Sequence, residues 1–204
     1  MYIPKIYKNE NQEEIRNFIH ENGFAILVNL TSGKLWATHI PLLLEKDETG
    51  NEILTGHVAI ENPQAKSFKD NKDVLVIFSG AHSYISSSWY DHENVPTWNY
   101  LAVHIYGNLK IINHEKAVAS LKRLVDKYEE KSKKPIKVDD LSNKTMQQAR
   151  GIVAFEILIN SIEAVKKMSQ NRDDKDYKNI ITELEKTNDN QAIEVANEMK
   201  KCSR

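Results

Sequence analysis

Short apolar runs separated by turn residues fill the first half of the chain. They lie at 24–30, 35–45, 52–59, 73–80 and 101–112. Runs of this length, bounded by turns such as TSGK and KDETGNE, predict strands, and the first two predict a hairpin. Only one short helix, over 61–71, interrupts them. The pattern favours an antiparallel barrel or sandwich over a fold of alternating strands and helices.

Helical patterns flank this region. Residues 11–22 carry a capping Asn11 and apolar positions at helical spacing, and Asn22-Gly23 ends the pattern. Residues 115–131 form an amphipathic stripe, 139–150 favour a further helix, and 151–159 return to a strand that could close the sheet. Residues 161–204 are charged and mostly helical in propensity. The predicted class is therefore mainly β with helical additions (α+β).

Composition narrows the functional classes. The 204 residues carry a net charge of −1, so nothing global indicates a protein that grips a phosphate backbone. Cys202 is the one cysteine, which excludes a disulfide framework or a cysteine metal site within the chain. The N-terminus has no apolar signal region, and the apolar runs are too short to span a membrane. A cytoplasmic protein is expected.

Strand 35–43 presents a candidate binding surface. Alternation puts Trp36 and Thr38 on one side and Ala37 and His39 on the other. His39 can be an ordinary sheet histidine with satisfied hydrogen bonds. The alternative is that this strand lines a ligand cavity or a subunit interface.

The stretch TGHVAIENPQAKSF (55–68) joins a strand to a helix N-terminus at Asn62-Pro63. Free backbone N–H groups there, with Lys66 one turn on and His57 nearby, could bind a phosphate. An ordinary capped helix explains the same residues.

The segment HSYISSSWYDHENVPTWNY (82–100) concentrates aromatic, hydroxyl and imidazole groups. Trp89 and Trp98 offer flat apolar walls, and Ser86 and Ser88 offer hydroxyl groups. The mixture suits a pocket for a planar heterocycle or a dimer interface, and both hold if the ligand lies between subunits. On the strand that follows, one face is aliphatic and suits a core. The other, with Tyr100, Ala102, His104 and Tyr106, needs a ligand, a partner subunit or the C-terminal helices to cover it.

Other constellations are incomplete. His82, His92 and His104 lack tight ligand spacing, and no carboxylate cluster is legible beside them, so no metal site is predicted. The G-x-S-x-G, P-loop and G-x-G-x-x-G motifs are missing, as is a helix-turn-helix. No catalytic residue is predicted.

Six segments together resemble the PaiB family: MYIPK (1–5), ATHIPL (37–42), TGHVAIENPQ (55–64), the long run 82–107, GIVAFEI (151–157) and KMSQNR (167–172). The resemblance covers most of 1–185 in family order, and the 82–107 stretch is long and unusual. Two departures are Ala65-Lys66 in place of a more usual Trp-Arg, and Ala81 in place of a usual Pro. Family members are described as FMN-binding negative transcriptional regulators, linked to protease synthesis and sporulation in Gram-positive bacteria.

The resemblance implies an FMN-binding split β-barrel of the pyridoxamine-oxidase-like type with C-terminal helices. It implies a barrel domain over 1–170 and a helical extension over 171–204. Two chains would form a homodimer, with FMN in the groove between them. DNA is a partner by family analogy only, and a membrane is not.

The same resemblance assigns expected cofactor-binding residues. Thr38 and His39 would lie along the isoalloxazine ring. The phosphate would be held by the turn with His57, Val58, Ala59 and Asn62, together with Lys66. The pocket would be completed, from the second subunit, by Ser86, Ser88, Trp89, Trp98 and Asn99, and Arg172 is a further candidate cation. The expected function is that of a cytoplasmic regulator. The alternatives are a flavin-dependent oxidoreductase and a barrel that has lost its flavin.

Overall fold

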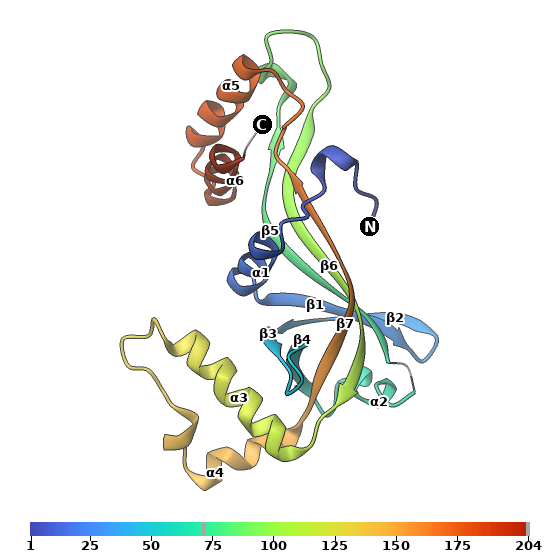
Figure 1. Ribbon diagram of the computed structural model, residues 1–204. Helices are drawn as coiled ribbons and strands as arrows, with labels where there is room; N and C mark the ends of the chain where they lie inside the picture. The colour runs from blue at the N-terminus through green and yellow to red at the C-terminus, as the bar shows by residue number, and fades with distance from the viewer. Residues whose placement is uncertain (71, 203–204) are drawn as a thin grey trace. The chain divides into compact units, whose positions relative to one another are not determined.

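The computed structural model describes residues 1–70 and 72–202. The chain divides into two compact units (Figure 1). Unit 1 comprises Met1–Phe18, Ser79–His104 and Glu163–Arg204, and unit 2 comprises Ile19–Phe78 and Ile105–Ile162. Each unit is therefore built from segments that are distant in sequence. Helix α1 (Gln12–Glu21) contributes residues to both units, as do the strands β5 (Asp73–Ile85), β6 (Thr97–Ile111) and β7 (Ile152–Lys167).

Within the described residues, the sheet has seven strands in the order β2-β1-β5-β6-β7-β4-β3. The pairs β1–β2, β1–β5, β3–β4 and β4–β7 are antiparallel. The strand bounds are β1 (Phe24–Thr31), β2 (Lys34–Pro41), β3 (Leu43–Lys46), β4 (Glu52–Ala59), β5 (Asp73–Ile85), β6 (Thr97–Ile111) and β7 (Ile152–Lys167). The predicted mainly β class with helical additions is confirmed.

The other helices are α2 (Pro63–Ser67), α3 (His114–Glu129), α4 (Asn143–Met146), α5 (Asp174–Glu185) and α6 (Asn190–Lys201). Short 3-10 turns occur at η1 (Lys5–Tyr7), η2 (Ser87–Trp89), η3 (Val138–Asp140) and η4 (Gln147–Gly151). Among the described residues, none of these helices is both long enough and apolar enough to cross a bilayer.

Three sequence expectations differ from the structure. The single strand expected over 35–45 is two strands, because the chain changes partners at Leu42 from β1 to β4. Residues 139–150 are mostly helical, as expected, but in the short pieces η3, α4 and η4 instead of one continuous helix. They bury little, and Ser142 caps a new helix start within them. Residues 161–167 are strand, since β7 continues through Lys167 despite its helical composition.

The core of unit 2 is apolar and tightly packed. Phe68, just after α2, meets Phe155 edge to face with ring centroids 5.4 Å apart, and both side chains are fully buried. Gly56 permits a close approach at this core, because a Cβ there would lie 2.4 Å from Leu42 Cδ2. Because Phe68 directly follows α2, its packing on Phe155 of β7 holds this helix against the sheet.

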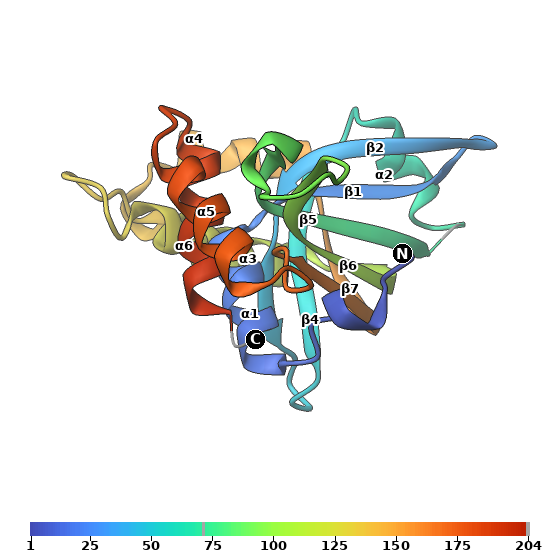
Figure 2. The same cartoon turned by 90° about the horizontal axis from the view of Figure 1, so that it is seen from above.

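The core of unit 1 is built from the C-terminal helices. Both views show α5 and α6 side by side (Figures 1 and 2). Their apolar positions recur at helical spacing and are buried with Ile85, Tyr90 and Met168. The residues after 170 thus supply the core against which the 82–100 segment packs.

Candidate functional site

A polar cluster in unit 2 joins β2 to the turn before α2. Asn62 Nδ2 donates a hydrogen bond to Thr38 Oγ1 at 3.0 Å, across 24 positions of sequence. The same side chain caps α2, because Asn62 Oδ1 accepts from the Gln64 N–H at 3.0 Å. Two of the predicted site residues are therefore in direct contact.

Gln64 fixes this cluster from beneath and is absent from the predicted set. Its side chain is fully buried, and Nε2 donates to Asn29 Oδ1 at 2.9 Å and to the Trp36 carbonyl at 3.2 Å. Ser67 extends the network by accepting from Asn29 Nδ2 at 2.9 Å. Gln64 Oε1 has no hydrogen-bond partner within the described residues. The sequence signal that could have identified Gln64 is the NPQ triplet (62–64), which places a side-chain amide in the first turn of a capped helix.

The first turn of α2 differs from the expectation of free amides. The Gln64 N–H is bonded to the Asn62 side chain, and the Ala65 N–H is bonded to the Asn62 carbonyl at 2.9 Å. The cap itself therefore uses donors that an anion would need. Lys66 is exposed on this helix and remains the cation of the turn.

The remaining predicted residues of unit 2 lie on β2 and β4. His39 is exposed, and its ring stacks on Phe24 with centroids 6.1 Å apart. His57 is partly buried, Val58 is buried and Ala59 is exposed. Burial lowers the pKa of His57 below its ordinary value, so a neutral imidazole is favoured near neutral pH.

Unit 1 holds an exposed aromatic surface, formed by His82, Tyr84 and Trp98. The Trp98 ring lies 6.0 Å from each of the other two rings, and Trp98 is 52% exposed. The Ser86 and Ser88 hydroxyl groups, which follow Tyr84 in sequence, bond each other at 2.8 Å. Trp98 is the predicted site residue of this surface, and it leaves a wide apolar ring face in solvent.

Three predicted residues of unit 1 are tied into its core. Trp89 packs against the core cluster, and its carbonyl accepts from Asn179 Nδ2 at 2.6 Å. Asn99 is fully buried, and its Oδ1 accepts from the Ser169 hydroxyl at 3.0 Å. The Arg172 guanidinium lies 4.4 Å from the Tyr90 ring centroid. These contacts give all three a structural role in the single chain.

The predicted residues thus form two groups, one in each unit. Unit 2 holds Thr38, His39, His57, Val58, Ala59, Asn62 and Lys66, and unit 1 holds Ser86, Ser88, Trp89, Trp98, Asn99 and Arg172. Hydroxyl, amide and ammonium groups in unit 2 suit the phosphate and polar edge of FMN. The exposed ring face in unit 1 suits the apolar isoalloxazine. The residues present fit this cofactor.

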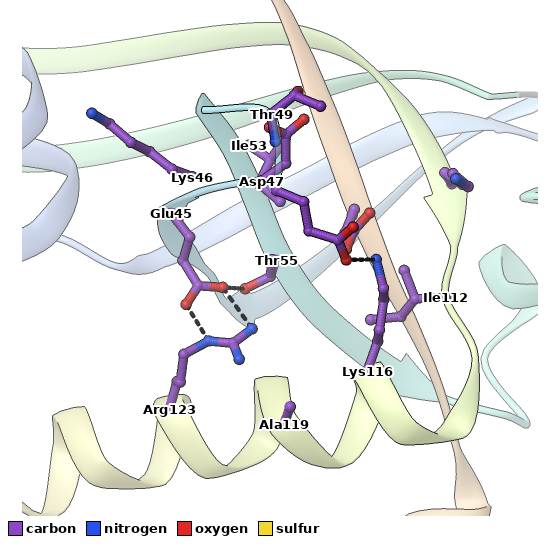
Figure 3. A pocket seen from close by; sticks show the side chains of 13 residues that line it. Glu45, Lys46, Asp47, Thr49, Ile53, Thr55, Ile112, Lys116, Ala119 and Arg123 are labelled. Atoms are coloured by element: carbon purple, nitrogen blue, oxygen red, sulfur yellow. Dashed lines mark hydrogen bonds and ion pairs between the residues drawn. The ribbon is translucent and has the colours of Figure 1, made fainter. Parts of the chain in front are cut away.

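A separate pocket of about 560 Å³ lies in unit 2 between the β3–β4 hairpin and α3 (Figure 3). None of the predicted residues lines it. Several of its charges are paired across it: Glu45 accepts from Thr55 Oγ1 at 2.6 Å and pairs with Arg123, and Lys116 pairs with Glu48 at 2.9 Å. These pairs link α3 to the hairpin.

Comparison with known proteins supports FMN as the cofactor. A family model described as "Putative FMN-binding domain" matches residues 1–161. The Bacillus subtilis (strain 168) protein named "Protease synthase and sporulation protein PAI 2" is 44% identical over 197 residues, covering 96% of this chain and 95% of that protein.

Two solved structures share the fold. The FAD and heme binding protein from Mycobacterium smegmatis has a TM-score of 0.64 at 14% identity, covering 83% of this chain and 78% of that one. The flavocytochrome Anf3 from Azotobacter vinelandii has a TM-score of 0.61 at 14% identity, with coverage of 87% and 78%. With the family match over most of its length and this close relative, the chain belongs to the PaiB family of FMN-binding proteins.

Proposed function

We propose that this protein is an FMN-binding homodimer that acts as a regulator, with the flavin held between the two copies. The observation that carries the proposal is the edge of the sheet formed by β1 and β2. Leu35 is 80% exposed and Phe24 is 64% exposed on this hairpin, and β2 is an edge strand. Exposed apolar side chains on an open edge favour burial against a second copy.

In this proposal one copy supplies the polar half of the site. The backbone of β2 near Thr38 and His39 lies along the polar edge of the isoalloxazine ring. Thr38 and Asn62 are held in place by their mutual bond and by Gln64 beneath. Lys66 binds the phosphate as a point charge, since the helix amides are used by the cap. His57, Val58 and Ala59 shape the adjoining strand end.

The other copy supplies the aromatic half. Trp98 covers a face of the ring, and Ser86 and Ser88 offer hydroxyl groups at its rim. Trp89, Asn99 and Arg172 act behind this surface, because each is bonded or packed within unit 1. FMN would supply electron-transfer chemistry when bound. The regulatory role is supported by the likeness to a relative whose name refers to protease synthase and sporulation.

Flavin titration tests the binding site. The purified chain should take up about one FMN per copy, followed by the quenching of flavin fluorescence. Lys66→Glu should weaken binding by at least about tenfold, because the charge that meets the phosphate is reversed. Lys69→Glu makes the same charge change at an exposed position two residues beyond α2 and is the matched control. Equal affinities for the two variants would refute the assigned phosphate contact.

Solution mass tests the dimer. Leu35→Glu should shift the protein from dimer to monomer in light scattering and should lower flavin content with it. Ile136→Glu places the same charge on another exposed apolar residue of unit 2, 55% exposed, and should leave the dimer intact. A dimer that survives Leu35→Glu would exclude this edge as the interface.

The regulatory role is tested against the oxidoreductase alternative with the FMN-loaded dimer. Tight, salt-sensitive binding to promoter DNA, with flavin that stays oxidised under anaerobic NAD(P)H, supports the regulator. Rapid bleaching of the flavin without DNA binding would overturn it and establish an enzyme.

A further inference from the structure

Three metal-ligating side chains meet in unit 1 at a place that the flavin site does not use. One ligand atom each from Asp91, His92 and Asp176 lies within 4.8 Å of the others. His92 Nδ1 is 3.1 Å from Asp91 Oδ1 and 3.4 Å from Asp176 Oδ2. Asp91 and Asp176 are 85 positions apart, which explains why spacing along the chain gave no sign of the group.

Asp176 provides an independent observation that points to a ligand. Its side chain is 1% exposed, on the first turn of α5. Oδ1 accepts from the Asp91 N–H at 3.1 Å, but Oδ2 has no hydrogen-bond partner in the part of the chain that the structure describes. A buried carboxylate oxygen without a donor is costly, so a cation at this oxygen would be stabilising. The oxygen is directed toward the His92 ring nitrogen.

His92 is held in position but can be reached from solvent. Its ring stacks on Tyr90 with centroids 6.0 Å apart and an interplanar angle of 26°. Its second ring nitrogen, Nε2, accepts from Asn94 Nδ2 at 3.1 Å; with Nδ1 on a metal ion, Nε2 would carry the proton and the Asn94 amide would have to turn its oxygen toward it. The side chain is 49% exposed. A metal ion could therefore approach Nδ1 without opening the core.

Nearby positive charges would compete with a metal ion for the two carboxylates. The Lys175 ammonium pairs with Asp91 Oδ2 at 2.7 Å, but the Lys175 side chain is 77% exposed and free to turn away. The α5 N-terminus adds a partial positive charge, which Asp173 and Asp174 offset at the same helix end. Removing the Lys175 charge should therefore favour a bound cation.

We propose that Asp91, His92 and Asp176 bind one divalent first-row transition cation, with water at the remaining positions. One imidazole nitrogen and two carboxylate oxygens suit Zn²⁺ or Mn²⁺, whereas Mg²⁺ and Ca²⁺ prefer all-oxygen sites. The ion would link the segment after η2 to α5. The site is independent of the flavin, since its ligands take no part in the proposed FMN contacts.

Calorimetric titration of the full chain with ZnCl₂ near pH 7.5 tests the proposal. One ion per chain is expected in the wild type. His92→Gln should weaken binding by at least about tenfold, and Lys175→Gln should strengthen it by roughly threefold. His82→Gln removes an exposed histidine of the same unit that belongs to no such group among the described residues, and should change nothing.

Asp176→Asn should also weaken binding. It keeps an oxygen for the Asp91 N–H, and His92→Gln serves alone if that variant does not fold. No binding at 1 mM zinc, or equal affinities for His92→Gln and His82→Gln, would overturn the proposal. A millimolar excess of Mg²⁺ that displaces Zn²⁺ would overturn the assignment to a transition metal.

Discussion

The two candidate surfaces differ in how the single chain supports them. In unit 2, Thr38 and Asn62 bond each other and rest on a buried network through Gln64. In unit 1, Trp98 presents a large ring to solvent, and this ring contacts the rings of His82 and Tyr84. The first surface is pre-organised by the chain itself. The second is an apolar face that gains most when something outside the chain covers it.

The largest change in stability is expected at Gln64, whose hydrogen bonds support the polar surface of unit 2. Gln64→Ala should lower the free energy of unfolding by about 3 kcal/mol, because it removes the buried amide that donates to Asn29 Oδ1 and to two strand carbonyls and opens a small cavity. Urea unfolding measures the loss. Gln12→Ala, at an exposed helix start, is the control. A loss below about 1 kcal/mol would show that unit 2 is not pre-organised through Gln64.

A smaller effect, of a different kind, is expected at Trp98. Trp98→Ala should leave the free energy of unfolding nearly unchanged, since half of the ring is already exposed, but should weaken FMN binding roughly tenfold. Val95→Ala, at a 70% exposed neighbour, should alter neither. Trp89 is less suited to this test because it also packs against the core. Unchanged FMN affinity in Trp98→Ala would remove the contrast between the two surfaces.

The smallest effect concerns the charge state of His57. Burial lowers its pKa from the ordinary value of 6.5, so the unfolded chain binds more protons than the folded chain in acid. Its contribution to stability is present above about pH 6.5 and is lost as the pH falls through the lower, folded-state value.

Thermal unfolding between pH 5 and 8 measures this contribution. His57→Gln should flatten the profile only in part, because burial also lowers the pKa of His104, in unit 1. Identical pH profiles for the wild type and His57→Gln would show that protonation of His57 does not destabilise the folded chain.

Much of the fold could be predicted from the sequence, because the hydrophobic period and the turn residues are local properties of the chain. Strand β4 was predicted with its observed bounds, and α1 within a residue at each end. Residues 161–167 were misread because Glu and Lys favour helix locally, while their pairing in the sheet is a tertiary gain. The role of Gln64 was missed because a polar residue in a short helix does not reveal whether it faces water or buried carbonyls.

The sequence by itself determined most of the element types, the mainly β class and the family, because hydrophobic period, turn residues and motif order are properties of the linear chain. Tertiary structure alone decided which polar groups meet. It joined Asn62 to Thr38, bonded Gln64 to Asn29 and to the Trp36 carbonyl, and brought Asp176 to Asp91 and His92. Such contacts depend on the closing of long loops between distant segments, and no local pattern encodes which side chains will then lie within bonding distance.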